Sequence, residues 1–317
     1  MEYKHISQNK TMLTDYYELT MSQAYFNQGL KDTIAYFDIF FRKVPDGGGY
    51  AIMAGLEQAI SYVENLHFTE EDLEFLRQTG DFSEDFLAYL RDMEFSCDIW
   101  AIPEGTPIFQ GEPILKVRGP VIQAQIIETM LLLTINHQSL IATKSSRIVS
   151  QAAGRPVMEF GARRAQGSDA SVLGARAAYI GGVASTSCTL AGEIFGIPLS
   201  GTMAHSFVQL YDSEFEAFKA YAESYPDNTV LLIDTYNVLE SGLPNAIRTA
   251  KEVLEPMGKR LKGVRIDSGD ITYLSQACRK VLDEAGLEDC NIVISNSLDE
   301  YIIREILIQG AKVDSFG

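Results

Sequence analysis

Two adjacent arginines, Arg163 and Arg164, directly follow a short apolar run at residues 157–160 in a chain whose formal net charge is −17. A guanidinium group binds carboxylates and phosphates through paired hydrogen bonds, so such residues can clamp an anion. An ordinary surface ion pair, for example with Asp169, explains the same arginines equally well. The sequence therefore predicts either an anion site or a solvated charge pair at this position.

A second pair of charged residues, Arg265 and Asp267, lies two positions apart at the end of the apolar run 263–266. Alternate residues of a strand project to the same face, so the two side chains should lie side by side. Charged groups inside a protein need partners or ligands, which favours a functional role for both residues.

His205 ends the stretch 200–205, Ser-Gly-Thr-Met-Ala-His, which follows the short apolar run 197–199. Histidine changes its charge near neutral pH and suits acid–base or phosphoryl chemistry. Gly201 allows a ligand to approach the backbone closely. A histidine that only caps a helix explains the residue equally well.

Other catalytic patterns are absent from the sequence. It has no Walker A loop, no hydrolase triad motif and no zinc spacing, and its four cysteines are scattered. We therefore expect no metal-ligand residues in the site. The available chemistry consists of arginines, carboxylates, a histidine and aromatic rings, which suits a reaction between a flat aromatic acid and a polyphosphorylated sugar.

The elements that must position these residues change character at residue 156. From there, short apolar runs alternate with helical segments, which predicts an α/β fold with a parallel sheet, either a barrel or a doubly wound sheet. Polar residues such as Asp234 follow nearly every run, as the catalytic loops of a barrel require. We therefore expect an irregular (β/α) barrel over residues 156–317. Its apolar runs lie at 157–160, 197–199, 230–233, 263–266, 292–294 and 311–316.

Residues 1–155 are expected to form a separate α+β domain that includes the long helices leading into the barrel. The run 34–42 is rich in β-forming residues, and the segment 97–118 is a series of short β runs broken by Pro and Gly. We expect these two segments to pair. Helices are expected in 11–30, in 51–92, where Thr69 and Ser83 can start helices with acidic first turns, and from residue 119 onward. In the second half of the chain, one helix is expected near 206–222.

Length and composition exclude several classes of protein. With 317 residues and 46% apolar content, the chain can bury a substantial core. Its 43 acidic residues against 26 basic ones argue against nucleic acid as a partner. Residues 1–20 lack the apolar core of a leader peptide, and no stretch reaches 18 apolar residues. We therefore expect a soluble, cytoplasmic protein with no membrane contact.

Five motifs, taken in order, carry a family resemblance. They are Leu-Thr-Asp-Tyr-Tyr at 13–17, Glu-Phe-Gly-Ala-Arg-Arg-Ala-Gln at 159–166, Gly-Thr-Met-Ala-His-Ser at 201–206, Asp-Thr-Tyr at 234–236 and Val-Arg-Ile-Asp-Ser-Gly-Asp at 264–270. Over essentially its whole length the chain resembles the nicotinate phosphoribosyltransferases, which are type II phosphoribosyltransferases.

The resemblance implies an N-terminal α/β domain packed on an irregular α/β barrel, in a homodimer with shared active sites. It also implies a reaction in NAD biosynthesis. Nicotinate and 5-phosphoribosyl 1-pyrophosphate would give nicotinate mononucleotide and pyrophosphate, coupled to ATP hydrolysis and assisted by Mg²⁺.

The resemblance assigns roles to the motif residues. His205 would accept a phosphoryl group, and Phe160 would stack on the pyridine ring together with Tyr17 of the neighbouring subunit. Arg163 and Arg265 would bind phosphate and carboxylate, and Asp267 would lie near the ribose and the ring. The remaining residues expected at the substrate site are Asp15, Gly201, Thr202 and Asp234.

Substrate choice and completeness are further expectations. The related nicotinamide enzyme has an aspartate in the loop after Gly181 and Gly182, and residues 183–189 here contain no acid, which favours nicotinate. The family continues beyond residue 317 into a Gly-Thr loop for the 5′-phosphate. We therefore expect a barrel that is incomplete at its C-terminus and a phosphate site that lacks one part.

Three alternatives remain open from the sequence. Quinolinate or nicotinamide phosphoribosyltransferase would share the fold, and the quinolinate enzyme needs no phosphorylated histidine, so stimulation by ATP distinguishes it. A phosphosugar aldolase or isomerase barrel would require a Schiff-base lysine at a strand end, and none of the strands ends in lysine. A non-catalytic fragment would bind ligand without forming product.

Overall fold

The computed structural model describes residues 9–317, so the expectation for residues 1–20 falls partly on residues 1–8, which lie outside the described part. The chain divides into two compact units, Met1–Thr143 and Lys144–Gly317. The division falls inside helix α6 (Glu128–Gln151), at residue 143 rather than at the expected residue 155.

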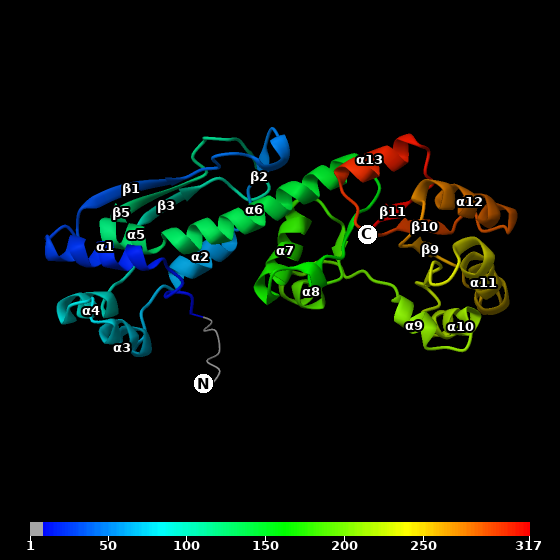
Figure 1. Cartoon of the computed structure of the whole chain (residues 1–317), viewed down its shortest axis with the longest axis horizontal. Helices are drawn as coiled ribbons and strands as arrows, with labels where there is room; N and C mark the ends of the chain where they lie inside the picture. Colours follow the sequence, from blue (N-terminus) through cyan, green and yellow to red (C-terminus); the bar gives the residue numbers. More distant parts are fainter. Residues whose placement is uncertain (1–8) are drawn as a thin grey trace. The chain divides into compact units, whose positions relative to one another are not determined.

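The N-terminal unit contains a three-stranded antiparallel sheet in the order β1-β5-β3 (Figure 1). Ile39 of β1 and Ala101 of β3 both lie opposite Leu115 of β5. The expected pairing of 34–42 with 97–118 is therefore confirmed. The bounds of its strands are β1 Ile34–Ile39, β3 Asp98–Ala101 and β5 Leu115–Pro120, and a small antiparallel pair is formed by β2 Ala51–Ile52 and β4 Pro107–Ile108.

Helices supply most of the buried surface of this unit. Helix α3 begins with a capping box between Thr69 and Asp72, and α4 begins where Ser83 accepts a hydrogen bond from the backbone of Phe86. Phe86 is completely buried in the core that these helices form with the sheet. The helices are α1 Tyr16–Asn27, α2 Leu56–Glu64, α3 Glu70–Thr79, α4 Glu84–Arg91, α5 Val121–Ile126 and the first part of α6, with a 3-10 turn at Pro45–Gly47.

The C-terminal unit contains a four-stranded parallel sheet in the order β11-β10-β9-β8 and a parallel pair, β6 with β7. Single parallel bridges connect Val157 with Phe316 and Thr186 with Leu199. The predicted parallel α/β arrangement is therefore confirmed. The strands are β6 Met158–Glu159, β7 Ser185–Thr186, β8 Val230–Leu232, β9 Gly263–Ile266, β10 Asn291–Ile294 and β11 Ser315–Phe316.

Helices connect these strands in succession, and α12 lies beside β10 (Figure 1). The segment expected as one helix at 206–222 is two helices, because Ser213 accepts a hydrogen bond from the backbone of Glu216 and starts a new helix. The helices are α7 Ser168–Ile180, α8 Thr189–Phe195, α9 His205–Gln209, α10 Glu214–Ser224, α11 Leu243–Thr249, α12 Ile271–Glu284 and α13 Glu300–Ile308. Shorter turns lie at Ala162–Arg164, Val238–Gly242, Ala250–Leu254 and Glu255–Met257.

The end of β9 carries polar side chains between buried ones. Val264 and Ile266 are fully buried, whereas Arg265 between them is only partly buried. Because neighbouring strands are parallel, the residues that follow them gather at one edge. No helix within residues 9–317 is long and apolar enough to cross a lipid bilayer.

Candidate functional site

A cavity of about 680 Å³ lies in the C-terminal unit at the carboxyl ends of β6, β9 and β10. Its lining includes seven of the ten residues to which the sequence assigned a place in the site, namely Phe160, Arg163, Gly201, Thr202, His205, Arg265 and Asp267. Segments more than 100 residues apart therefore meet in one cavity, as expected for the carboxyl edge of a parallel sheet.

Arg265 is held by an extensive set of hydrogen bonds. Its Nε donates to Ser295 Oγ at 2.6 Å, and its Nη2 donates to Asp267 Oδ1 at 2.9 Å. Its Nη1 donates to Thr202 Oγ1 at 3.1 Å and to the Met203 carbonyl at 3.4 Å. The prediction that Arg265 and Asp267 share one face is confirmed, and the arginine is fixed in one orientation.

Asp267 lies between Arg265 and the open part of the cavity. Its Oδ1 accepts hydrogen bonds from Ser295 and Arg265, and its Oδ2 has no partner among residues 9–317. Burial opposes ionisation of this carboxyl group, but the hydrogen bonds from Ser295 and Arg265 outweigh it and lower the pKa of Asp267 below its usual value. Asp267 therefore presents an anionic oxygen to a ligand at neutral pH.

His205 is oriented by a buried carboxylate. Its Nε2 lies 3.1 Å from Oδ1 of Asp234, whose side chain is only 1% exposed. Oδ2 of Asp234 accepts hydrogen bonds from the backbone N–H of Asp267 at 3.2 Å and from Ser268 Oγ at 2.5 Å. Because a carboxylate only accepts, Nε2 of His205 is the donor, and Nδ1 of the neutral ring keeps its lone pair. The predicted Asp234 therefore lies behind His205.

The loop after β6 presents an aromatic face. Glu159 accepts hydrogen bonds from the backbone N–H of Gly161 and from Thr186 Oγ1, which fixes the backbone on both sides of Phe160. The guanidinium carbon of Arg265 lies 5.6 Å from the centre of the Phe160 ring. A flat ligand stacked on this ring would lie beside a cation.

The two adjacent arginines behave differently. Arg164 donates to the Phe160 carbonyl at 3.3 Å, which ties it to its own loop. Arg163 is exposed, lines the cavity, and has no hydrogen bond or ion pair with any residue that the structure describes. The alternative of an ion pair between Arg163 and Asp169 is therefore not found, and Arg163 is available for an anion.

Two predicted site residues belong to the N-terminal unit. Asp15 precedes helix α1, and Tyr17 is in the first turn of that helix with 45% of its surface exposed. The Tyr17 hydroxyl donates to Glu128 Oε1 at 2.9 Å, and this bond, together with burial and the nearby negative charge, raises the pKa of Tyr17 to about 12. The structure describes the two units separately, so the roles of Asp15 and Tyr17 remain predictions.

Some residues of the site were not selected from the sequence. Ser295 lines the cavity and bonds both Arg265 and Asp267, and Thr186 and Ser268 orient the two other carboxylates. The available signal was position, because Ser295 directly follows the apolar run 292–294 and Ser268 lies two residues after the run 263–266. Serine is common at such positions, so position alone does not reveal which hydroxyl bridges two charged groups.

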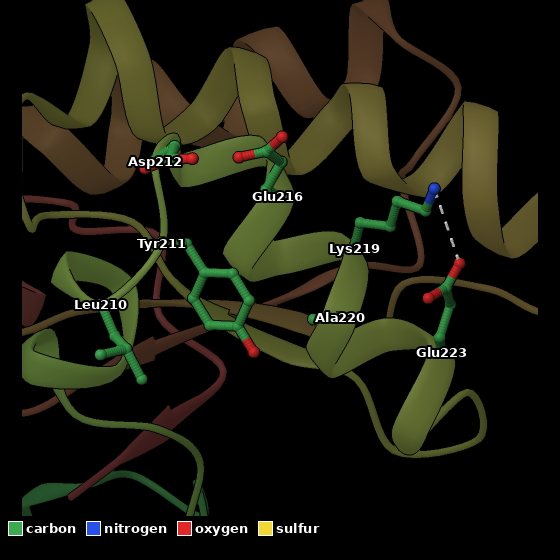
Figure 2. A pocket seen from close by; sticks show the side chains of 7 residues that line it. All are labelled: Leu210, Tyr211, Asp212, Glu216, Lys219, Ala220 and Glu223. Atoms are coloured by element: carbon green, nitrogen blue, oxygen red, sulfur yellow. Dashed lines mark ion pairs between the residues drawn. The ribbon is translucent and has the colours of Figure 1, made fainter.

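A second hollow, of about 340 Å³, lies over α9 and α10 (Figure 2). Figure 2 shows Lys219 paired with Glu223, with 3.8 Å between Nζ and Oε1. The lysine of this hollow is therefore engaged, and none of its seven lining residues belongs to the five motifs. Across residues 9–317, no group of three or more His, Cys, Asp or Glu side chains is arranged to hold a metal ion.

Comparisons with known proteins agree with the motifs. The family model for the nicotinate phosphoribosyltransferase N-terminal domain matches residues 12–136. A nicotinate phosphoribosyltransferase of Bacillus subtilis is 46% identical over 319 residues, covering 100% of this chain and 64% of that protein. The enzyme pncB2 of Mycobacterium tuberculosis, with the same name, is 47% identical over 308 residues, covering 96% of this chain and 65% of that protein.

A solved structure gives the same answer. The crystal structure of human nicotinic acid phosphoribosyltransferase superposes with a TM-score of 0.90 and 33% identity, covering 96% of this chain and 72% of that one. This chain thus spans slightly less than two thirds of the two bacterial relatives and more than two thirds of the human protein. From the motifs, the cavity and these matches together, the chain belongs to the nicotinate phosphoribosyltransferase family.

Proposed function

We propose that the chain forms nicotinate mononucleotide and pyrophosphate from nicotinate and 5-phosphoribosyl 1-pyrophosphate, as the names of its relatives indicate. One observation carries the proposal: a single cavity brings together an aromatic face, an unpartnered arginine and a histidine oriented by a buried carboxylate. These groups match a flat aromatic acid, a phosphate and a phosphoryl acceptor.

The pyridine ring of nicotinate stacks on Phe160, and its carboxylate accepts a hydrogen bond from Arg265, whose guanidinium lies beside that ring. Stacking contributes on the order of 1 kcal/mol beyond the buried area. Selection of the acid is supported by the stretch 183–189, since Val183 and Ser187 line the cavity and the stretch contains no carboxylate. Both oxygens of Glu159 are engaged by hydrogen bonds, so it is not an open acceptor for an amide.

Displacement at the anomeric carbon needs little acid–base help. The pyridine nitrogen attacks that carbon with its own lone pair while the bond to the pyrophosphate oxygen breaks and the electron pair leaves with pyrophosphate. Positive charge develops on the ribose, and the free Oδ2 of Asp267 stabilises it, while Arg163 binds phosphate oxygens. Catalysis then rests on positioning and on fixed charges.

ATP coupling is proposed to run through His205. With Nε2–H donated to Asp234, Nδ1 attacks the γ-phosphorus of ATP, the bond from that phosphorus to the bridging oxygen breaks, and ADP leaves with the electron pair. The phosphoryl group on the imidazole is later transferred to water. While present, it adds negative charge beside the cavity and would change the affinity for phosphate-bearing ligands.

Mg²⁺ is the proposed metal, and it would neutralise charge on the pyrophosphate when bound. Mg²⁺ is commonly held by one or two carboxylates together with substrate phosphates, so a dedicated protein cage is not required. Although the sequence predicts no metal-ligand residues, Asp267 fits this role, because its Oδ2 is anionic and unpartnered within the described part of the chain.

We also propose an irregular barrel and a homodimer with shared sites. The barrel is supported by the bridges from β11 to Val157 and from Thr186 to Leu199, which extend parallel pairing beyond the four-stranded sheet. The homodimer is supported by the exposed ring of Tyr17, which a second copy can use as the other face of a ring sandwich. Mixing Tyr17→Ala with His205→Ala chains should restore ATP-stimulated activity that neither has alone. If the mixture stays inactive while each chain still dimerises, the shared site is wrong.

The test of the proposed function is pyrophosphate release from phosphoribosyl pyrophosphate with nicotinate, with and without ATP, for the wild type and His205→Ala. We expect nicotinate to drive release and ATP to increase it only when His205 is present. Release with quinolinate or nicotinamide but not nicotinate would retain the fold and reject the substrate. Binding of nicotinate without any release would support a non-catalytic chain.

A further inference from the structure

Ser295 holds a central place in the polar network of the cavity although no motif includes it. It directly follows β10 and is only 3% exposed. Its backbone N–H donates to the carbonyl of Ile266 at 3.0 Å, so its position relative to β9 is fixed by strand pairing. Its hydroxyl therefore has a defined origin between the two charged residues that follow β9.

The directions of the hydrogen bonds around Ser295 are determined by chemistry. Arg265 Nε can only donate, so Ser295 Oγ accepts from it at 2.6 Å and keeps its hydrogen for Asp267 Oδ1 at 2.5 Å. The Ser295 hydroxyl thus bridges the Arg265 guanidinium and the Asp267 carboxylate by accepting one hydrogen bond and donating another. The two contacts cannot be exchanged, so the hydroxyl fits only one relative orientation of the two side chains.

This bridge decides which atoms remain for a ligand. Four of the five N–H donors of Arg265 are engaged, on Nε, on Nη1 twice and on Nη2 once, which leaves one Nη2 hydrogen. Asp267 keeps Oδ2 free because Ser295 and Arg265 both use Oδ1. Arg265 and Asp267 together therefore offer a ligand one donor and one acceptor in fixed places.

We infer that Ser295 is a positioning residue that sets the orientation of Arg265 and Asp267 toward the nicotinate and ribose groups of the substrates. This inference rests on the proposed function for the identity of the ligand. Without the hydroxyl, Nε of Arg265 loses its acceptor and Asp267 Oδ1 loses one donor. The guanidinium is then free to turn its Nε edge toward Asp267 or the solvent, and its single remaining Nη2 hydrogen is no longer presented in one place.

The test compares Ser295→Ala with Ser275→Ala. Ser275 is also a fully buried serine, and its hydroxyl donates to the Thr272 carbonyl and accepts from the Lys312 N–H, both at 3.1 Å, in α12 and away from the cavity lining. Both variants lose a buried hydroxyl. Only Ser295→Ala should weaken nicotinate binding measured by calorimetry, by about 10- to 100-fold, since it removes hydrogen bonds to charged groups. Ser295→Thr, which keeps the hydroxyl, should recover most of the affinity.

A second readout does not depend on nicotinate. In ¹⁵N–¹H spectra, the Arg265 Nε–H signal, assigned by its loss in Arg265→Lys, should be protected from exchange in the wild type and in Ser275→Ala. It should lose protection in Ser295→Ala. Unchanged protection in Ser295→Ala, or nicotinate affinity within twofold of Ser275→Ala, would overturn the positioning role. If the wild type binds no nicotinate at all, the proposed function fails, and the Nε–H signal alone supports or overturns the placement by Ser295.

Discussion

Replacing Asp234 with asparagine should reverse the tautomer of His205. In the wild type, Oδ2 of Asp234 receives the two donors Asp267 N–H and Ser268 O–H, and Oδ1 receives His205 Nε2. Asparagine has only one side-chain oxygen, and this oxygen should occupy the position of the present Oδ2, where two donors meet it. Its amide NH₂ then faces His205, so Nε2 must accept and the ring hydrogen moves to Nδ1. The lone pair that the proposed phosphorylation requires is lost.

The size of this effect follows from the hydrogen bond that is reversed. To keep the reactive tautomer, the variant must place two donors opposite each other and lose a hydrogen bond to a charged group, which costs about 1.5–3 kcal/mol. The reactive fraction of His205, and with it the rate of phosphohistidine formation, should fall about 10- to 150-fold. The burial of Asp234, with its side chain 1% exposed, leaves little room for water to replace the lost acceptor.

The assay is transfer of label from γ-³²P-ATP to the chain, quenched in alkali, where phosphohistidine survives. Wild type, Asp234→Asn and His205→Ala are compared at saturating ATP, with thermal unfolding of each variant as the control for folding. His205→Ala should take up no label. Labelling of a folded Asp234→Asn variant within threefold of the wild-type rate would refute the tautomer argument. Absence of label in the wild type would instead reject the phosphohistidine.

Three further predictions concern stability and reactivity. Lys144→Ala should lower the free energy of unfolding by about 2 kcal/mol, because it leaves the buried carboxylate of Glu300 without a cation. The Glu300 side chain is only 7% exposed, and its oxygens have no described partner besides Lys144 Nζ at 2.7 Å. Because the lysine is half exposed, the loss is smaller than for a fully buried pair. Urea titration measures this free energy, and the double variant with Lys144→Ala and Glu300→Gln should recover most of the lost stability. Gly242→Ala would drive its Cβ into the backbone carbonyl oxygen of Ile233, so it should lower the free energy of unfolding by about 3 kcal/mol in the same titration. Gly49→Ala, with open space around it, should change stability little. Burial raises the pKa of Cys278 to about 12, so its iodoacetamide reaction at pH 8 should be far slower in the native chain than in urea; equal rates would contradict the buried position.

Local patterns were sufficient to predict the parts of the fold that local chemistry determines. The capping signal at Thr69 starts a helix as expected, and alternation along 263–267 places Arg265 beside Asp267. The break before α10 was missed because Ser213 was not recognised as a cap, although Glu216 three residues later completes the usual pattern. The error arises when the helical spacing of apolar residues is used to predict one continuous helix although a capping residue lies within it.

Long-range partners could not be derived in the same way. His205 and Asp234 were each selected, but their contact depends on the order and register of strands that are 29 residues apart in sequence. Ser295 illustrates the same limit, since its importance depends on the direction in which its hydroxyl points. Strand-end position identifies the candidates, and only side-chain geometry separates a solvent-facing serine from one that bridges two charges.

Arg163 and Arg265, two of the arginines that line the cavity, also show why residue type alone does not assign a role. The chain carries a net charge of −17, which disfavours the approach of an anion at long range. At physiological salt, charges beyond about 8 Å are largely screened, so local cations decide whether an anion binds. Arg265 cannot form a paired clamp on an anion, because a single donor remains after its bonds to the protein. Arg163 has no hydrogen-bond partner among residues 9–317 and can bind a phosphate through two donors. In the proposed site, the fixed Arg265 donates one hydrogen bond to the carboxylate of the ring, and Arg163 binds a phosphate. The two arginines together explain how a strongly acidic chain can hold two anionic substrates in one cavity.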